Sequence, residues 1–294
     1  MLRVIHLIPR VAFIKGLIIC SMHLIERMSD FYAFYKTART PHDIHSPALF
    51  ALINAVFDRS GDHPDFNKIE GLRKKLLKDQ ATIQVRTIGA PSAVQKSPHR
   101  TVAREAKGSL SPSFQGRWLH RLVRVLQPTR MLELGTSFGL STLYQHLATP
   151  TSAFVTIEGN QDIANRAALH WEEWQSAASI EPLVGLFDDA LADLGGTYDY
   201  IFIDGDHRSE SLLRYMDTLR KISQPGAVYV LHDIHWSQDM LDGWRRVIDL
   251  EFVTASIDLY HFGILLTDEA INTRQHLSVV PTWMKPWRLG IWGK

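Results

Sequence analysis

The sequence predicts an α/β protein with a doubly wound, mostly parallel sheet and a C-terminal antiparallel hairpin, preceded by a helical N-terminal region. Three observations carry this prediction. From residue 129 onward, short apolar runs alternate with segments of helical period; a glycine-rich turn follows the first run; and acidic residues follow nearly every later run. Such alternation favours a parallel sheet with helices on both faces. The 294 residues provide for one large domain or two small ones.

The amino-acid composition excludes some classes of protein and indicates how charge is distributed along the chain. The single cysteine, Cys20, excludes an internal disulfide framework and a four-cysteine zinc site, so a cytoplasmic location is expected. The net charge of +1 hides an asymmetry: residues 68–130 hold 14 Lys/Arg against 3 Asp/Glu, whereas residues 131–294 hold 11 against 22. This pattern favours a basic segment that complements an acidic body, with attraction of an anionic partner as the alternative.

The first 27 residues are apolar but interrupted by Arg3, Arg10 and Lys15. Their longest uninterrupted run, residues 16–22, is far shorter than the roughly 20 residues that a bilayer span requires. We expect a helix packed on the body, and the alternative is an amphipathic helix at a membrane interface.

The rest of the N-terminal region divides into two parts. Residues 29–58 have the pattern helix, turn, helix, with Ser46 as a suitable N-cap and Pro47 at the first helical position. Residues 80–115 are rich in Ser, Pro, Gly and Lys and lack a period, so a long loop or lid is expected there. We therefore interpret residues 1–115 as a helical extension with a basic lid loop.

The next domain is placed at residues 116–268 and a tail at 269–294, because the strand–helix alternation lies between these limits. The expected elements are a strand at 131–134, a helix from 140, a strand at 153–157, a helix at 161–175, strands at 180–184 and 200–203, a helix at 209–222, a strand at 227–231, a helix at 237–248, and strands at 252–257 and 262–266. The short gap between the last two predicts a hairpin.

The tail combines aromatic and basic residues. Trp283, Trp287 and Trp292 alternate with Lys285 and Arg288. Packing back on the domain is the simpler interpretation, and contact with a membrane interface or a partner is the alternative.

The turn after the first strand reads Glu-Leu-Gly-Thr-Ser-Phe-Gly over residues 133–139. Glycines let the backbone turn tightly and approach a ligand, and the helix that follows offers free N–H donors. A dinucleotide fingerprint is disfavoured, because Ser137 replaces its second glycine and Leu140 stands at its third. A single adenosyl group remains as the nucleotide interpretation.

The same turn also has the form G-x-S-x-G, which is typical of a serine hydrolase with Ser137 as nucleophile. Asp233 and His261 would follow in the required order. Two arguments oppose this alternative. Such a turn normally follows several strands, and the hydrolase gives no function to the acids at the later strand ends.

Those acids are the stronger signal. Glu158 follows the second strand, 25 positions after Glu133, and a carboxylate there can accept hydrogen bonds from both hydroxyls of a ribose. Asp188, Asp204 and Asp233 follow the third, fourth and fifth strands. One such acid would be interpreted as a helix cap, but acids at nearly every strand end on one side of a sheet predict a ligand site.

This arrangement resembles the class I S-adenosylmethionine-dependent methyltransferases, especially their O-methyltransferase-like families. Residues 133–141 resemble the first motif, Glu158 the acid of the second strand, and the hairpin the reversed last strand. The resemblance covers about residues 115–268 and implies a Rossmann-like fold. Residues 202–208 and 233–237 further resemble a poorly characterised bacterial branch of the superfamily.

The resemblance implies S-adenosylmethionine as cofactor. The glycine turn would hold its methionine part with Glu133 near the amino group, Glu158 would hold the ribose, and the turn at 185–189 would lie beside the adenine. Asp204 would lie close to the methyl group. The implied cofactor-binding residues are Glu133, Gly135, Thr136, Ser137, Gly139, Glu158, Asp188 and Asp204.

The resemblance also raises the question of whether this protein binds a metal ion. In metal-dependent, catechol-type relatives, an Asp after the fourth strand and an Asp-Asn pair after the fifth bind a divalent cation. Asp204 and Asp233 match, but Ile234 stands where the Asn would be, so a required metal is disfavoured.

Methyl transfer to oxygen needs donor and acceptor aligned about 3 Å apart and a group that takes the proton. The candidate catalytic residues are Asp204, His207, Asp233 and His235, because they follow strand ends and histidine titrates near neutral pH.

The expected function is therefore S-adenosylmethionine-dependent methyl transfer to an oxygen of a small acceptor, for which the basic segment suggests an anionic group. The alternatives are the serine hydrolase and a non-catalytic domain that binds S-adenosylmethionine. Nucleic acid is disfavoured as a partner, because no known nucleic-acid module accompanies the basic residues. Peripheral membrane contact through either terminal segment stays open, and the oligomeric state is not determined by the sequence.

Overall fold

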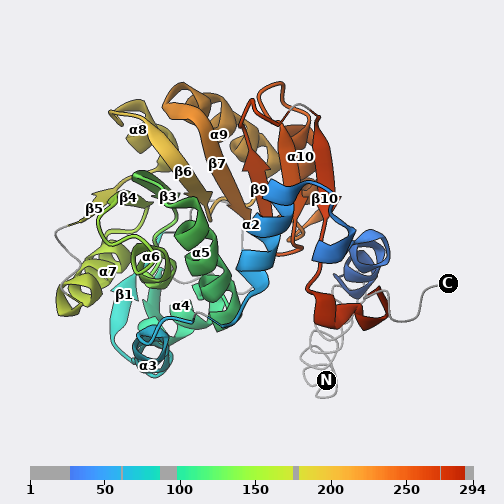
Figure 1. Cartoon of the computed structure of the whole chain (residues 1–294). Coiled ribbons are helices and arrows are strands. Elements are labelled where there is room, and N and C mark those ends of the chain that lie inside the picture. The colour runs from blue at the N-terminus through green and yellow to red at the C-terminus, as the bar shows by residue number, and fades with distance from the viewer. Residues whose placement is uncertain (1–26, 61, 87–97, 175–178, 272, 289–294) are drawn as a thin grey trace, which may run out of the picture.

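The computed structural model describes residues 27–60, 62–86, 98–174, 179–271 and 273–288, and it confirms the expected α/β architecture (Figure 1). A central eight-stranded sheet is parallel throughout except for β9, which is antiparallel to both of its neighbours. Its order is β10 (Gln275–Ser278), β8 (Ala255–Asp258), β9 (Phe262–Leu266), β7 (Ser223–His232), β6 (Tyr198–Ile203), β3 (Arg130–Leu134), β4 (Ala153–Glu158) and β5 (Ile180–Val184). The expected C-terminal hairpin is therefore present as β8 and β9.

Helices cover both faces of this sheet, because successive side chains of each strand point to opposite sides. Met131 packs into one apolar core and Leu132 into the other. The first core contains residues of α2 (Pro47–Phe57), α3 (Phe66–Leu76), α5 (Ser113–Leu126), α6 (Leu140–His146) and α7 (Gln161–Glu173). The second contains residues of α8 (Phe187–Ala192), α9 (Ser209–Lys221) and α10 (Gln238–Ile248).

Local sequence signals set several helix starts. Ser46 caps α2, its side chain accepting from the backbone N–H of Leu49 at 3.5 Å, and Pro47 is the first helical residue, as expected. Ser237 caps α10 in the same way through the N–H of Met240 at 3.1 Å. These caps lie where the apolar period begins, so sequence and structure agree there.

The prediction of a long loop over residues 80–115 is wrong for most of the residues that the structure describes there. β1 (Thr82–Gln84) pairs antiparallel with β2 (His99–Thr101), and α4 (Val102–Ser109) follows directly. Thr101 caps this helix by accepting from the N–H of Arg104 at 3.2 Å. Elements this short present too few core residues to give a readable period. Residues 87–97 lie outside the described residues, and the division of the chain at 115 and 268 stays a prediction.

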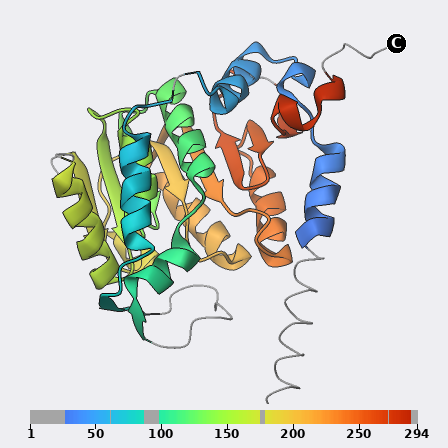
Figure 2. The same ribbon diagram turned by 90° about the horizontal axis from the view of Figure 1, so that it is seen from below.

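The two terminal segments pack against each other at one edge of the sheet (Figure 2). β10 extends the sheet, and its continuation at Val279 bridges to Arg39. Tyr35 donates to the carbonyl of Met284 at 2.6 Å, and Lys285 donates to the carbonyl of Ala38 at 2.6 Å. The described part of the tail therefore packs back on the protein.

Other expectations about the termini fall on residues that the structure does not describe. Residues 1–26 and Trp292 lie outside the described ranges. The side chains of Trp283 and Trp287 are 68% and 59% exposed, so both rings remain accessible although the tail backbone packs. Within the described ranges, no helix combines the length and the apolar character needed to cross a bilayer.

Acid should weaken the packing of α5. His120 of α5 is buried, its ring nitrogen lies 3.0 Å from the carbonyl of Tyr144, and burial lowers its pKa to about 4. An unfolded chain binds this proton near pH 6.5, so between pH 6.5 and 4 the unfolded state holds more protons. The free energy of unfolding should fall by about 2 kcal/mol across this window. Urea unfolding at pH 7.5 and 4.5 measures the loss, which His120→Gln should reduce. An equal loss in both proteins would contradict the assignment.

Candidate functional site

The carboxyl ends of β3, β4, β6 and β7 open onto a cavity of about 910 Å³. The strand ends form its floor, and residues 104–112, from α4 to the start of α5, form a wall across from them. A volume of several hundred Å³ at this edge of a parallel sheet is typical of a small-molecule site. The candidate residues that line the main cavity are Gly135, Ser137, Glu158, Asp204, His207 and Asp233, while Thr136 lines a smaller cavity beside it.

The glycine turn passes directly beside the end of β6. Gly135 has φ +104°, and its N–H donates to the carbonyl of Ile157 at 2.9 Å. A Cβ at this position would lie 1.8 Å from the carbonyl oxygen of Asp204. Only glycine therefore allows β3 to leave the sheet here, both because of its φ and because of this close approach.

Gly139 has a different function from the one expected. Its φ is +79°, and a Cβ would lie 2.6 Å from Nε1 of Trp171 in α7. It is absent from the cavity lining among the described residues. Gly139 thus allows α6 to begin close against α7.

Glu158 lies beside the glycine turn, because β3 and β4 are parallel neighbours. One carboxylate oxygen accepts from the N–H of Ser137 at 2.9 Å, and the other accepts from the N–H of Asn160 at 2.9 Å. Burial raises the pKa of this carboxyl, against the lowering effect of these donors. The structure therefore brings the turn and the second-strand acid to one cavity wall, as the sequence predicted.

Glu133 lies under the turn rather than in the cavity. Its side chain is fully buried and accepts from Ser141, Thr142, Gln145 and Thr156 at distances of 2.5–3.0 Å. Burial raises its pKa to about 7. The strand alternation turns this carboxylate toward α6, so it fixes the helix behind the glycine turn and is not placed to contact a ligand directly.

A buried polar chain that the sequence analysis missed crosses the floor of the site. Nδ1 of His232 lies 2.8 Å from Oδ1 of Asp204, and Nε2 lies 2.9 Å from Oε1 of Gln115 in α5. Burial lowers the pKa of His232, but the charge and hydrogen bond of Asp204 outweigh it and raise the pKa to about 9. Burial raises the pKa of Asp204, and His232 in turn holds it below its usual value. His232 and Asp204 therefore form a buried pair in which each shifts the pKa of the other toward its charged form.

Asp233 and His207 remain accessible from the cavity. The side chain of Asp233 is 26% exposed, and its backbone has φ +54°, a strained conformation for a residue with a Cβ. Nε2 of His207 lies 3.9 Å from Asp204. Trp236, which was not expected in a ligand site, and His261, which was named only for the serine-hydrolase alternative, also line the cavity.

His235 lies outside this cavity, contrary to the expectation that it is catalytic. Its Nε2 lies 2.9 Å from Oδ2 of Asp258, its ring stacks on Tyr260 at 4.7 Å, and only 8% of its side chain is exposed. The turn after β7 directs it toward the helix at residues 27–37, where Phe34 contacts it. It joins the N-terminal helix to the sheet.

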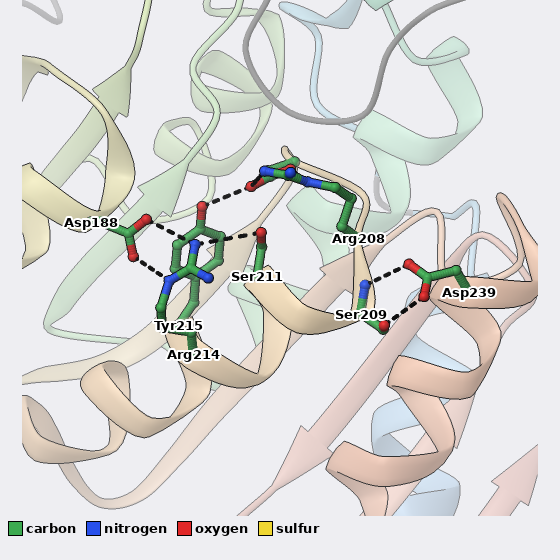
Figure 3. Close-up of polar contacts among 8 residues, drawn as sticks. Asp188, Arg208, Ser209, Ser211, Arg214, Tyr215 and Asp239 are labelled. Carbon is green, nitrogen blue, oxygen red and sulfur yellow. Dashed lines mark hydrogen bonds and ion pairs between the residues drawn. The ribbon is translucent and has the colours of Figure 1, made fainter.

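Asp188 also lies outside the cavity and points to solvent. Its carboxylate binds Arg214 of α9 in a two-point ion pair at 2.7 and 2.9 Å (Figure 3). Leu186 and Phe187 of the same turn line the cavity instead. The predicted turn is therefore correct, but its apolar residues rather than its acid face the site.

The loop that carries His207 is held by its own network. Asp206 accepts from Arg208 at 2.5 and 2.8 Å and from the hydroxyl of Tyr215 at 3.0 Å, and Asp239 caps Ser209 at the start of α9 (Figure 3). These contacts fix the loop at the cavity rim.

The donor set does not fit a divalent cation. Asp204 is already hydrogen-bonded to His232 at 2.8 Å, and Ile234, which stands where a further ligand would be needed, is completely buried in the core. Across the described ranges, no group of three or more His, Cys, Asp or Glu side chains is arranged to hold a metal. Two carboxylates, one of them held by His232, offer a poor oxygen shell.

Ser137 does not have the surroundings of a nucleophile. Its hydroxyl donates to the hydroxyl of Ser109 at 3.1 Å rather than to an imidazole. His261, the histidine that a hydrolase would require, has its ring against Phe114 at 5.5 Å. The hydrolase is therefore not favoured, although Ser137 has φ +49°.

Replacing Gly135 should destabilise the protein strongly. In Gly135→Ala the new Cβ meets the backbone of Asp204, so we expect the free energy of unfolding to fall by at least about 3 kcal/mol. Gly71 lies inside α3, and a Cβ added there would meet no atom within 4 Å, so Gly71→Ala should stabilise by about 1 kcal/mol. Chemical denaturation measures both, and similar stabilities for the two variants would contradict this account of the turn.

Comparison with known proteins finds similarity to methyltransferases over the part of the chain that carries these features. Residues 132–234 match a family described as a methyltransferase domain. A catechol O-methyltransferase of Mycobacterium tuberculosis is 33% identical over 122 residues, which cover 41% of this chain and 54% of that protein. A catechol O-methyltransferase of Niastella koreensis is 29% identical over 139 residues, which cover 46% of this chain and 62% of that protein. The chain thus spans little more than half the length of these curated relatives.

The fold agrees. The crystal structure of an O-methyltransferase from Bacillus cereus in complex with SAH is 18% identical, with a TM-score of 0.51 over 71% of this chain and 93% of that one. The matched family segment begins in β3 and ends just after β7, so it contains the glycine turn and the acids that follow four strands. Residues 132–234 of this chain are thus similar to a methyltransferase domain, part of the chain is similar to curated O-methyltransferases, and the fold is shared with an O-methyltransferase of known structure.

Proposed function

We propose that this chain transfers a methyl group from S-adenosylmethionine to an oxygen of a small acceptor. The main support for this proposal is that the turn at Gly135 and the carboxylate of Glu158 lie side by side at one wall of a cavity of about 910 Å³. The curated relatives named catechol O-methyltransferases support an oxygen acceptor.

The cavity offers matching chemistry to each part of the cofactor. Glu158 is fixed by two backbone donors and can still accept from ribose hydroxyls with its remaining lone pairs. Leu186 and Phe187 supply an apolar wall next to it for a base. Asp204 lies at the far side of the glycine turn, where a carboxylate stabilises positive charge.

When bound, S-adenosylmethionine supplies an electrophilic methyl group on a positively charged sulfur. With the cofactor held by Glu158 and the glycine turn, an acceptor oxygen would take this methyl group, and S-adenosylhomocysteine would leave. The acceptor hydroxyl gives its proton to Asp233 or His207, both of which line the cavity. His232 keeps Asp204 in place through their 2.8 Å hydrogen bond.

Nucleic acid remains disfavoured as a partner, because internal ion pairs use part of the basic segment. Arg73 binds Glu70 at 3.0 Å, and Arg100 binds Glu105 at 2.7 Å in the protein interior. We also propose a cytoplasmic location, on the ground of the single cysteine. Turnover with an acceptor distinguishes this enzyme from a domain that only binds the cofactor.

Glu158→Gln should weaken binding of S-adenosylhomocysteine at least about tenfold, since a charged acceptor for the ribose is lost. Isothermal titration calorimetry measures the affinity. Glu181→Gln is the matched control, because Glu181 is an exposed carboxylate on the adjacent β5 and does not line the cavity. Unchanged affinity in Glu158→Gln would reject the ribose assignment.

Metal should be dispensable. Because His232 holds Asp204 and Ile234 is buried, adding magnesium chloride or a chelator should leave both the melting temperature and the affinity for S-adenosylhomocysteine unchanged. Differential scanning fluorimetry and calorimetry provide these measurements. A rise in melting temperature with magnesium that disappears in Asp233→Asn would instead establish a metal site.

A further inference from the structure

The described part of the N-terminal helix, residues 27–37, brings Arg27 to the cavity. Phe31 and Phe34 pack against the ring of Tyr260 at centroid distances of 4.9 and 5.3 Å. The hydroxyl of Tyr260 donates to the carbonyl of Arg27 at 3.4 Å. Since Tyr260 lies in the turn between β8 and β9, Arg27 is held close to the sheet.

Arg27 and Trp236 together form one side of the cavity mouth, on the side of Asp233. The guanidinium carbon of Arg27 lies 5.4 Å from the centre of the indole ring, and Trp236 is 50% exposed. The ring of His207 lies 6.1 Å from that of Trp236. A flat, accessible aromatic surface therefore lies beside a cation, next to the candidate bases.

The guanidinium of Arg27 lies over an indole ring, and no described carboxylate pairs with it. The acids that line the cavity have other partners: Asp204 and Asp233 face His232, Asp206 binds Arg208, Glu105 binds Arg100, and Glu158 accepts from Ser137 and Asn160. Guanidinium groups bind carboxylates through two parallel hydrogen bonds.

We propose that Arg27 and Trp236 select the acceptor, which is an aromatic carboxylate whose ring stacks on Trp236 and whose carboxylate binds Arg27. The acceptor hydroxyl then faces Asp233 and His207. This inference rests on the proposed methyl transfer and adds the substrate class. It also gives the N-terminal helix a function, because that helix supplies the selecting cation from outside the matched family segment.

Benzoate and benzyl alcohol are the probes, because they share a ring and differ in charge. We expect the wild-type protein to bind benzoate about fivefold more tightly than benzyl alcohol, measured by ligand-observed NMR titration with and without S-adenosylhomocysteine. Arg27→Gln should abolish this preference by weakening benzoate alone, and Arg27→Lys should keep part of it. Trp236→Ala should weaken both probes.

Matched controls separate local effects from general ones. Arg245→Gln removes an exposed arginine of α10 that pairs with Asp242, and Trp283→Ala removes an exposed indole, and neither residue lines the cavity. Both should bind the probes as the wild type does. The inference fails if wild-type protein does not prefer benzoate, or if Arg27→Gln retains the preference. Failure to bind S-adenosylhomocysteine, with benzoate recognition intact, would reject the proposed methyl transfer instead.

Discussion

The close passage of the backbone at Gly135 beside the carbonyl of Asp204 is the constraint on which the site depends. Because Gly135 has no Cβ, the chain that leaves β3 can pass close to the carboxyl ends of both β4 and β6. Glu158 then lies within hydrogen-bonding distance of the turn, and Asp204 lies on its other side. A cavity at the edge of the sheet follows from this packing, since each strand end delivers a polar group to the same wall.

Buried polar and ionisable side chains around the cavity allow few alternative packings of the neighbouring helices. Glu133 accepts four hydrogen bonds from α6 and β4, and the pair of Asp204 and His232 is completed by Gln115 of α5. Groups of this kind are costly to bury unless each finds its partners, so they tolerate few alternative packings. They fix the helices around the cavity, while residues that line it, such as Asp233 and His207, stay partly accessible.

Much of the fold was readable in the sequence, because the apolar periods of strands and helices are local properties. β9 and the cap of α2 lie where the sequence placed them, and the glycine turn adjoins Glu158 because parallel neighbours end at the same edge. α4 was missed because a helix of this length, following a short strand, presents few core residues. The same local signals located the wall of the site that the proposed cofactor would occupy.

The tertiary structure alone decided which strand-end residues face the cavity. Glu133, Asp188 and His235 were expected in the site, but strand alternation, an ion pair with Arg214 and stacking on Tyr260 turn them away. His232 and Arg27 enter because Gln115 and Tyr260, which are distant in the chain, hold the parts around them. The sequence determined the order of the elements and the chemistry available at the sheet edge. Long-range packing determined which of those groups meet, because side-chain direction depends on neighbours that no local pattern specifies.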